Sequence, residues 1–202
     1  MRGKVTTNRF GGIWRGTSMM RLALALLGTL GLAGCVPDYL TRDDSEVIIS
    51  IWAINGAATL HSDVRADDGT VTSDEVTVSW GVRHKNLRQE APMIPQWVLL
   101  ERYEVSYFRS DGRAVEGEDV PYRITGALTT GENVETSGGA EFLLEIVRAQ
   151  AKLEPPLMNL RAGGGAIVLT VFANVTLHGR TWSGQAVTTS GRLQIDFADW
   201  GG

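Results

Sequence analysis

The stretch IVLTVFANVTL, residues 167–177, is the longest segment of alternating residue types in this chain. Every second residue from Ile167 to Leu177 is apolar, and threonine, asparagine and Phe172 stand among the positions between them. Because successive side chains of a β-strand point to opposite faces, this pattern predicts a strand with one face in the protein core.

Shorter segments with the same period of two occur along most of the chain after Glu46. We expect seven or eight strands, at residues 47–54, 58–65, 75–85, 97–109, 120–126, 141–152, 166–178 and 185–197. Residues that accept positive φ separate several of them, at 67–69, 110–112 and 178–179. Many short strands separated by turns predict an all-β fold, an antiparallel β-sandwich, rather than alternating β and α units.

Residues 140–153, AEFLLEIVRAQAKL, fit two interpretations. Phe142, Leu144 and Ile146 alternate as in a strand, but the segment is also rich in strong helix formers with apolar residues near helical spacing. We favour the strand, because a sandwich must bury a sheet partner there, and keep the helix as the alternative. The two prolines at 155 and 156 end either element, and residues 157–160 are expected to form one helical turn.

The charge of the chain is unevenly distributed. There are 19 Lys and Arg and 23 Asp and Glu, and five of the basic residues but none of the acidic ones fall in residues 1–34, which leaves 14 basic against 23 acidic residues. An acidic body without basic clusters is poorly suited to neutralising phosphates, so we expect no nucleic acid as a partner. One cysteine cannot form an internal disulfide, so the core alone must stabilise the domain.

Residues 19–35, MMRLALALLGTLGLAGC, combine one positive charge, an apolar stretch and a final cysteine. Arg21 supplies the charge, and the apolar stretch from Leu22 to Ala33 is shorter than the ~20 residues that a membrane-spanning helix needs. Small residues precede Cys35, the only cysteine of the chain. These features are typical of a secretory signal peptide.

The four residues Leu32, Ala33, Gly34 and Cys35 resemble the lipobox of bacterial lipoproteins. This resemblance implies that residues 1–34 are removed as a signal peptide and that the Cys35 sulfur receives a diacylglycerol, often with a further acyl chain on the new amino group. Two acyl chains give stable membrane anchoring, whereas one is marginal. Residues 1–18 fit a signal peptide poorly, so we expect the true start at Met19 or Met20.

Residues 35–45 are expected to form a lipidated tether and residues 46–202 the β-sandwich domain. A flexible tether of this length spans roughly 15–20 Å. Val36 follows the cysteine. Because an Asp at this place favours inner-membrane retention in enterobacterial lipoproteins, the resemblance implies a cell-envelope protein at the outer membrane, either periplasmic or surface-exposed.

The predicted body resembles, by architecture only, the immunoglobulin-like and fibronectin-like sandwiches of bacterial envelope proteins. It lacks the Cys, Trp and Cys pattern of antibody domains, so the resemblance implies no binding residue.

The tryptophans are the candidate contact residues. Trp52 and Trp80 lie within predicted strands, and we expect them in the core. Trp97, Trp182 and Trp200 lie at strand or chain ends, where an exposed indole can stack on a sugar or dock into a partner. The structural alternative is that these three seal the ends of the sandwich.

No pattern of catalytic residues stands out. A GxSxG motif is absent, and His61, His84 and His178 share no ligand spacing. Acidic residues at 43–44, 67–68, 116, 118 and 119 are expected to be solvated loop residues, with calcium binding as the alternative. We expect no catalytic residue, no metal and no cofactor.

These features together predict a lipid-anchored, non-enzymatic module of the cell envelope. Its partners would be the membrane and an unknown envelope protein, and an exposed sheet edge offers backbone hydrogen bonds for such contacts. A carbohydrate- or ligand-binding module that uses the end tryptophans is the alternative, and an envelope hydrolase with a site assembled from distant residues is the third candidate.

Overall fold

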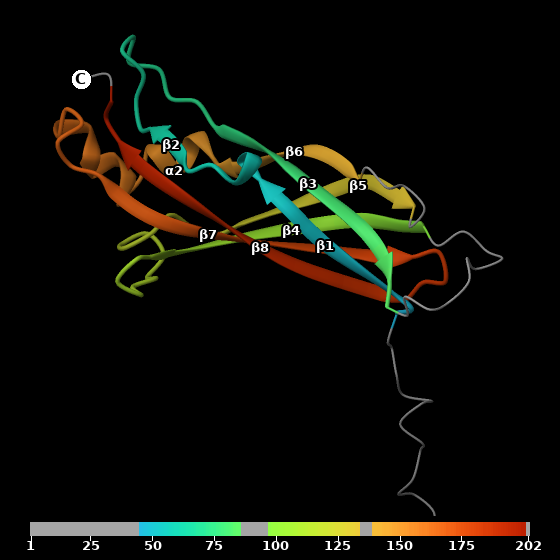
Figure 1. Ribbon diagram of the computed structural model, residues 1–202. Helices are drawn as coiled ribbons and strands as arrows, with labels where there is room; N and C mark the ends of the chain where they lie inside the picture. Colours follow the sequence, from blue (N-terminus) through green and yellow to red (C-terminus); the bar gives the residue numbers. More distant parts are fainter. Residues whose placement is uncertain (1–44, 86–96, 134–138, 201–202) are drawn as a thin grey trace, which may run out of the picture. The chain divides into compact units, whose positions relative to one another are not determined.

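The alternating segments of the sequence form two β-sheets that pack together, as the computed structural model shows for residues 45–85, 97–133 and 139–200 (Figure 1). The three-stranded sheet has the order β1-β3-β6, built from Val47–Ile54, Asp74–His84 and Ala140–Val147. The five-stranded sheet has the order β2-β8-β7-β4-β5, built from Leu60–Asp63, Ala186–Ala198, Leu169–Thr181, Trp97–Arg109 and Ile124–Asn133. The predicted all-β architecture is therefore confirmed.

The core lies between the two sheets and is formed by alternate residues of the strands. On β7 every second residue from Leu169 to Leu177 is buried, as the period of two predicts, and the residues between them, Phe172 included, are only partly buried. Trp80 of β3 is fully buried between the sheets, as expected. Ile167, the first residue of the predicted alternation, lies before β7 and is exposed.

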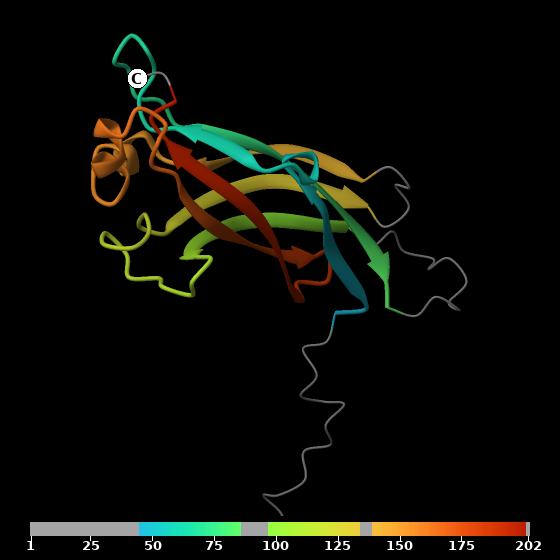
Figure 2. The ribbon, with the colours of Figure 1, turned by 60° about the vertical axis from the view of Figure 1, so that its left-hand side comes forward.

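One strand pair is parallel, so the expectation of a wholly antiparallel sandwich is wrong. β2 runs in the same direction as β8, with Leu60 opposite Ile195 and Asp63 opposite Ala198. A short 3₁₀ turn at Asn55–Ala57, in which all three residues have positive φ, carries the chain from one sheet to the other (Figure 2).

Most predicted strands agree with the structure to within three residues, and two segments differ. The strand predicted at 120–126 is β5, which begins at Ile124 and continues to Asn133, because residues 110–123 form a loop. Residues 140–153 contain both predicted alternatives: β6 ends at Val147, and Ala149–Lys152 form the short helix α2. The expected helical turn after the prolines is the 3₁₀ helix Leu157–Ala162.

The prediction of a turn at residues 178–179 is wrong. β7 continues through both residues to Thr181. Gly179 serves close strand packing, since a Cβ atom there would lie 2.5 Å from the carbonyl oxygen of Leu99. The turn predicted at 67–69 is confirmed, with Gly69 at φ 82°.

The two ends of the domain can be named by the residues that mark them. At the Ser45 end the described chain begins, and Ser45, Val47 and Lys85 line a small cavity with Ala186 to Thr188 at the start of β8. At the Trp200 end, β2 and β8 finish side by side. No helix within the described residues is long and apolar enough to cross a membrane.

Candidate functional site

Trp97 and Trp182 lie next to each other at the Ser45 end. Trp97 is the first residue of β4, and Trp182 directly follows β7, the neighbour of β4 in the sheet. The backbone N–H of Trp182 donates a hydrogen bond to the carbonyl oxygen of Trp97 at 2.9 Å. The two residues are 50% and 79% exposed. The structure thus brings together two of the three predicted contact residues.

Backbone hydrogen bonds hold the turn that carries Trp182. Thr181 and Gln185 close the turn through a 2.9 Å bond from the Thr181 N–H to the Gln185 carbonyl oxygen. The Gly184 N–H donates to the Thr181 carbonyl oxygen at 2.9 Å, and Gly184 has φ 83°, a conformation that suits glycine. The Trp182 backbone is therefore fixed while its indole stays open to solvent.

A groove of about 430 Å³ runs beside the two indoles on the outer face of the five-stranded sheet. Leu99 lies next to Trp97 on this face and is 48% exposed. Gly131 of β5 is opposite Leu99 and has no side chain, so that flank of Leu99 stays uncovered. We call the surface of Trp97, Leu99 and Trp182 the tryptophan groove.

One ion pair borders the tryptophan groove. Arg180 Nε lies 3.2 Å from Glu101 Oε2, and both side chains are about half exposed, so the pair contributes little stability. Glu101 occupies a β-bulge, because β4 has one residue more than β7 between Leu100 and Arg102. The bulge lets both Glu101 and Arg102 face solvent while Leu100 stays in the core. The groove is therefore apolar with a balanced pair of charges at its border.

Trp200 lies at the other end of the domain and is not part of the tryptophan groove. Its backbone N–H donates to Asp63 Oδ1 at 3.2 Å, and its ring contacts the ring of His61 edge to face at 5.9 Å. It is 47% exposed. The three predicted contact residues thus divide into a pair and a distant single residue.

Trp52 was expected in the core, and this prediction is wrong. It is 53% exposed on the outer face of β1, and its Nε1 donates to Ser50 Oγ at 3.1 Å. Its indole covers Gly81 and Gly139, where an added Cβ would come within 2.2 and 2.3 Å of the ring. The surrounding sequence VIISIWAI is apolar at nearly every position, so alternation alone does not tell which face Trp52 takes.

The lipobox residues Leu32, Ala33 and Gly34 and the lipid attachment residue Cys35 lie outside the described residues. Their assignment therefore remains a prediction.

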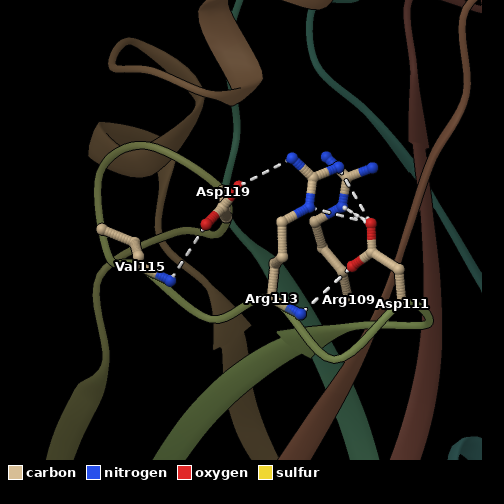
Figure 3. Close-up of polar contacts among 5 residues, drawn as sticks. All are labelled: Arg109, Asp111, Arg113, Val115 and Asp119. Carbon is tan, nitrogen blue, oxygen red and sulfur yellow. Dashed lines mark hydrogen bonds and ion pairs between the residues drawn. The ribbon is translucent and has the colours of Figure 1, made fainter.

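The loop between β4 and β5 is held by charged side chains (Figure 3). Arg113 donates to both oxygens of Asp111, from its backbone N–H at 3.1 Å and its Nε at 2.9 Å. These hydrogen bonds hold the pKa of the Asp111 carboxyl below its usual value. Arg109 Nε lies 3.4 Å from the same carboxylate, so two arginines share one acid.

Three of the acidic residues considered as calcium ligands, Asp68, Glu116 and Asp119, have other partners, and Asp43 and Asp44 lie outside the described residues. Asp119 Oδ2 accepts the Val115 N–H at 3.4 Å and its Oδ1 lies 3.5 Å from Arg113, as Figure 3 shows. Glu116 pairs with Arg123 at 2.8 Å, and Asp68 accepts the Thr70 hydroxyl at 2.6 Å. In the part of the chain that the structure describes, no three acidic, histidine or cysteine residues gather in a way that suits a metal ion.

A buried polar cluster near the start of β3 is absent from the sequence predictions. Lys152 of α2 is 1% exposed and donates from Nζ to Asp74 Oδ1 at 2.9 Å. The other Asp74 oxygen accepts the hydroxyl of Ser62, a fully buried residue of β2, at 2.6 Å. The cluster joins α2 and β3 to a strand of the opposite sheet. It has no sequence signal, because Asp74 and Lys152 are 78 residues apart.

Tyr107 also links the sheets. Its hydroxyl donates to the carbonyl oxygen of Ile146 on β6 at 2.5 Å, and burial raises the pKa of Tyr107 well above its usual value. The three histidines are spread over the domain, with His61 beside Trp200, His84 at the end of β3 and His178 near Thr188.

No family model matches the chain, and no curated protein matches it. The structure itself defines the class of protein as an all-β domain of two packed sheets with an exposed pair of tryptophans at one end.

Proposed function

We propose that this protein is a lipid-anchored protein of the bacterial cell envelope, and that its β-sandwich domain is a non-enzymatic structural or protein-interaction module. The lipobox-like residues Leu32 to Cys35 support the anchor, and Cys35 stands ten positions before Ser45. The single structural observation that supports an interaction role is the open outer edge of β5.

β5 is the last strand of its sheet and is ten residues long. Its sequence ITGALTTGEN has no proline, lysine or arginine, the residues that commonly protect edge strands from pairing. Arg148 donates from Nη2 to the Thr125 carbonyl oxygen at 3.2 Å, which covers the beginning of the edge. Beyond Thr125, β4 is the only strand that pairs with β5 among the described residues. Such an edge offers backbone hydrogen bonds to an added strand.

We also propose that the sandwich is of the immunoglobulin or fibronectin type. Taken in chain order, β1, β3 and β6 would be strands A, B and E of one sheet, and β4, β7 and β8 would be strands C, F and G of the other. β5 extends the second sheet beside strand C, as the additional strand C′ does in variable-type domains.

A photo-cross-linking residue at position 129 tests the interaction role. Thr129 is exposed on β5, and Thr176, partly exposed on the central strand β7 and paired with β4 on one side and β8 on the other, provides the matched control position. In intact envelopes we expect one discrete cross-linked product from position 129 and none from position 176. The same cross-linker in a Cys35→Ala protein is expected to give less product, because the unanchored protein leaves the membrane. An identical set of products from both positions, or none from either, would contradict the proposal.

A further inference from the structure

The described chain begins at the end of the domain that carries the tryptophan groove. Ser45 and Val47 lie beside Ala186 in one small cavity, and Ala186 pairs with Arg180, which lines the groove. The first residues of the domain and the two indoles therefore share one end.

The length of chain before Ser45 limits how far this end can lie from a membrane. Cys35 stands ten positions before Ser45, and a chain of this length spans about 35 Å when fully extended and less when coiled. If Cys35 carries a lipid, the Ser45 end must stay within that distance of the bilayer. This step rests on the anchor proposed above.

The chemistry of the tryptophan groove suits the boundary between lipid and water. Tryptophan gathers at this boundary because its ring is largely apolar but carries one N–H donor. Trp97, Leu99 and Trp182 are each about half exposed or more. Among the described side chains that line the groove, the charged ones are Glu101 and Arg180, and their ion pair leaves no net charge between them.

Among the described side chains, two basic residues and one acidic residue also lie at this end of the domain. Arg83 and Lys85 lie at the end of β3, and Glu46 precedes β1. Basic residues near a membrane are attracted to anionic head groups. At the opposite end, the half-exposed Trp200 contacts His61 and Asp63 and stands beyond the end of β8.

From these observations we propose that the tryptophan groove inserts into the head-group region of the bilayer that holds Cys35, and so forms a second membrane contact. One lipid anchor alone leaves the domain free to rotate on its tether. Contact through Trp97, Leu99 and Trp182 fixes its orientation, with the Ser45 end on the lipid and the Trp200 end facing away.

Tryptophan fluorescence of the lipidated protein tests this contact. The mature protein is placed in vesicles of phosphatidylethanolamine and phosphatidylglycerol that contain a lipid with a nitroxide near the head group. We expect the nitroxide to quench the emission of Trp97 and Trp182. The quenched component should disappear in a Trp97→Ala/Trp182→Ala protein and persist in Trp200→Ala.

A second variant changes the groove but keeps its fluorophores. We expect Leu99→Glu to lower nitroxide quenching by at least about twofold, because a carboxylate resists transfer out of water. The matched control is Leu143→Glu, since Leu143 is 67% exposed on β6 in the other sheet. Quenching should be unchanged in this control.

Different results are expected if the lipid anchor is missing and if the anchor is present but the groove does not touch the membrane. If the lipidated protein and its Cys35→Ala variant float equally poorly with vesicles, the anchor is absent. Suppose instead that the lipidated protein floats, but iodide in the water quenches Trp97 and Trp182 as strongly as it does in the unlipidated protein without vesicles. The groove then does not touch lipid, and the inference is overturned. Protection of the same indoles by a soluble glycan instead of by lipid would also overturn it, in favour of a sugar site. The wild-type measurement needs no variant and so does not depend on the folding of one.

Discussion

Replacement of Lys152 by methionine is expected to destabilise the domain strongly although it preserves the length of the side chain. The Lys152 ammonium is 1% exposed and its partner Asp74 is 18% exposed, with 2.9 Å between Nζ and Oδ1. In Lys152→Met the carboxylate of Asp74 loses the ammonium and keeps, among the described residues, the hydroxyl of Ser62 as its partner. The variant therefore leaves a largely buried charge without its counter-ion.

The expected cost follows from the burial of the partner that remains. Loss of one member of a buried ion pair costs about 3–5 kcal/mol. For Lys152→Met we expect about 3 kcal/mol, the lower limit, because water reaches part of Asp74. Asp74→Asn leaves the more deeply buried Lys152 ammonium and should cost about 4–5 kcal/mol. The double variant removes both charges, so its cost should fall at least about 2 kcal/mol below the sum of the single costs.

Urea denaturation of an unlipidated Cys35→Ala protein, followed by the emission of the buried Trp80, measures these free energies. In thermal unfolding, Lys152→Met should lower Tm by roughly 6–12 °C, since 1 kcal/mol corresponds to about 2–4 °C in a domain of this size. Single variants that each cost less than about 1 kcal/mol, with costs that simply add, would contradict a strongly coupled buried pair of Lys152 and Asp74.

Three further predictions concern the core, a loop glycine and pH. Leu177→Ala removes a fully buried side chain and should cost about 2–5 kcal/mol in urea denaturation, whereas Leu143→Ala, at an exposed position, should cost under about 0.5 kcal/mol. Gly117→Ala should destabilise more than Gly69→Ala in thermal unfolding: both glycines have positive φ, but only a Cβ at 117 would clash, at 2.3 Å from the Tyr122 hydroxyl. Because burial raises the pKa of Tyr107 in the folded state, its stabilisation is complete below pH 10 and is lost as the unfolded chain ionises at higher pH, by up to about 1.4 kcal/mol per pH unit. Alkaline denaturation of Tyr107→Phe should accordingly show a shallower loss of stability, and an equal slope would contradict this assignment.

The strands that bury one face could be predicted because their apolar residues alternate. β7 shows this most clearly, since nearly every inward position is apolar. The bounds of β5 could not be predicted, because most of ITGALTTGEN is small or polar and an edge strand requires less burial. The parallel pairing of β2 with β8 has no local signal either, since it depends on the path of the chain between the two sheets.

The candidate site could be predicted only in part. Trp97 and Trp182 could be singled out because they lie at strand ends in the sequence. Their contact could not be predicted, because it arises from the pairing of β4 with β7, and two other strands separate these in the chain. Trp52 was misplaced because large aromatic residues usually contribute to the core, whereas here two glycines on neighbouring segments make room for the ring on the outer face. The groove also depends on Gly131, because a residue without a side chain opposite Leu99 leaves that flank of Leu99 uncovered.

Mass spectrometry of the N-terminal peptide of the mature protein, isolated from bacterial membranes, tests the central proposal most directly. We expect this peptide to begin with Cys35 and to carry a diacylglycerol on its sulfur. A mature chain that retains residues before Cys35, or an unmodified Cys35 thiol, would contradict it.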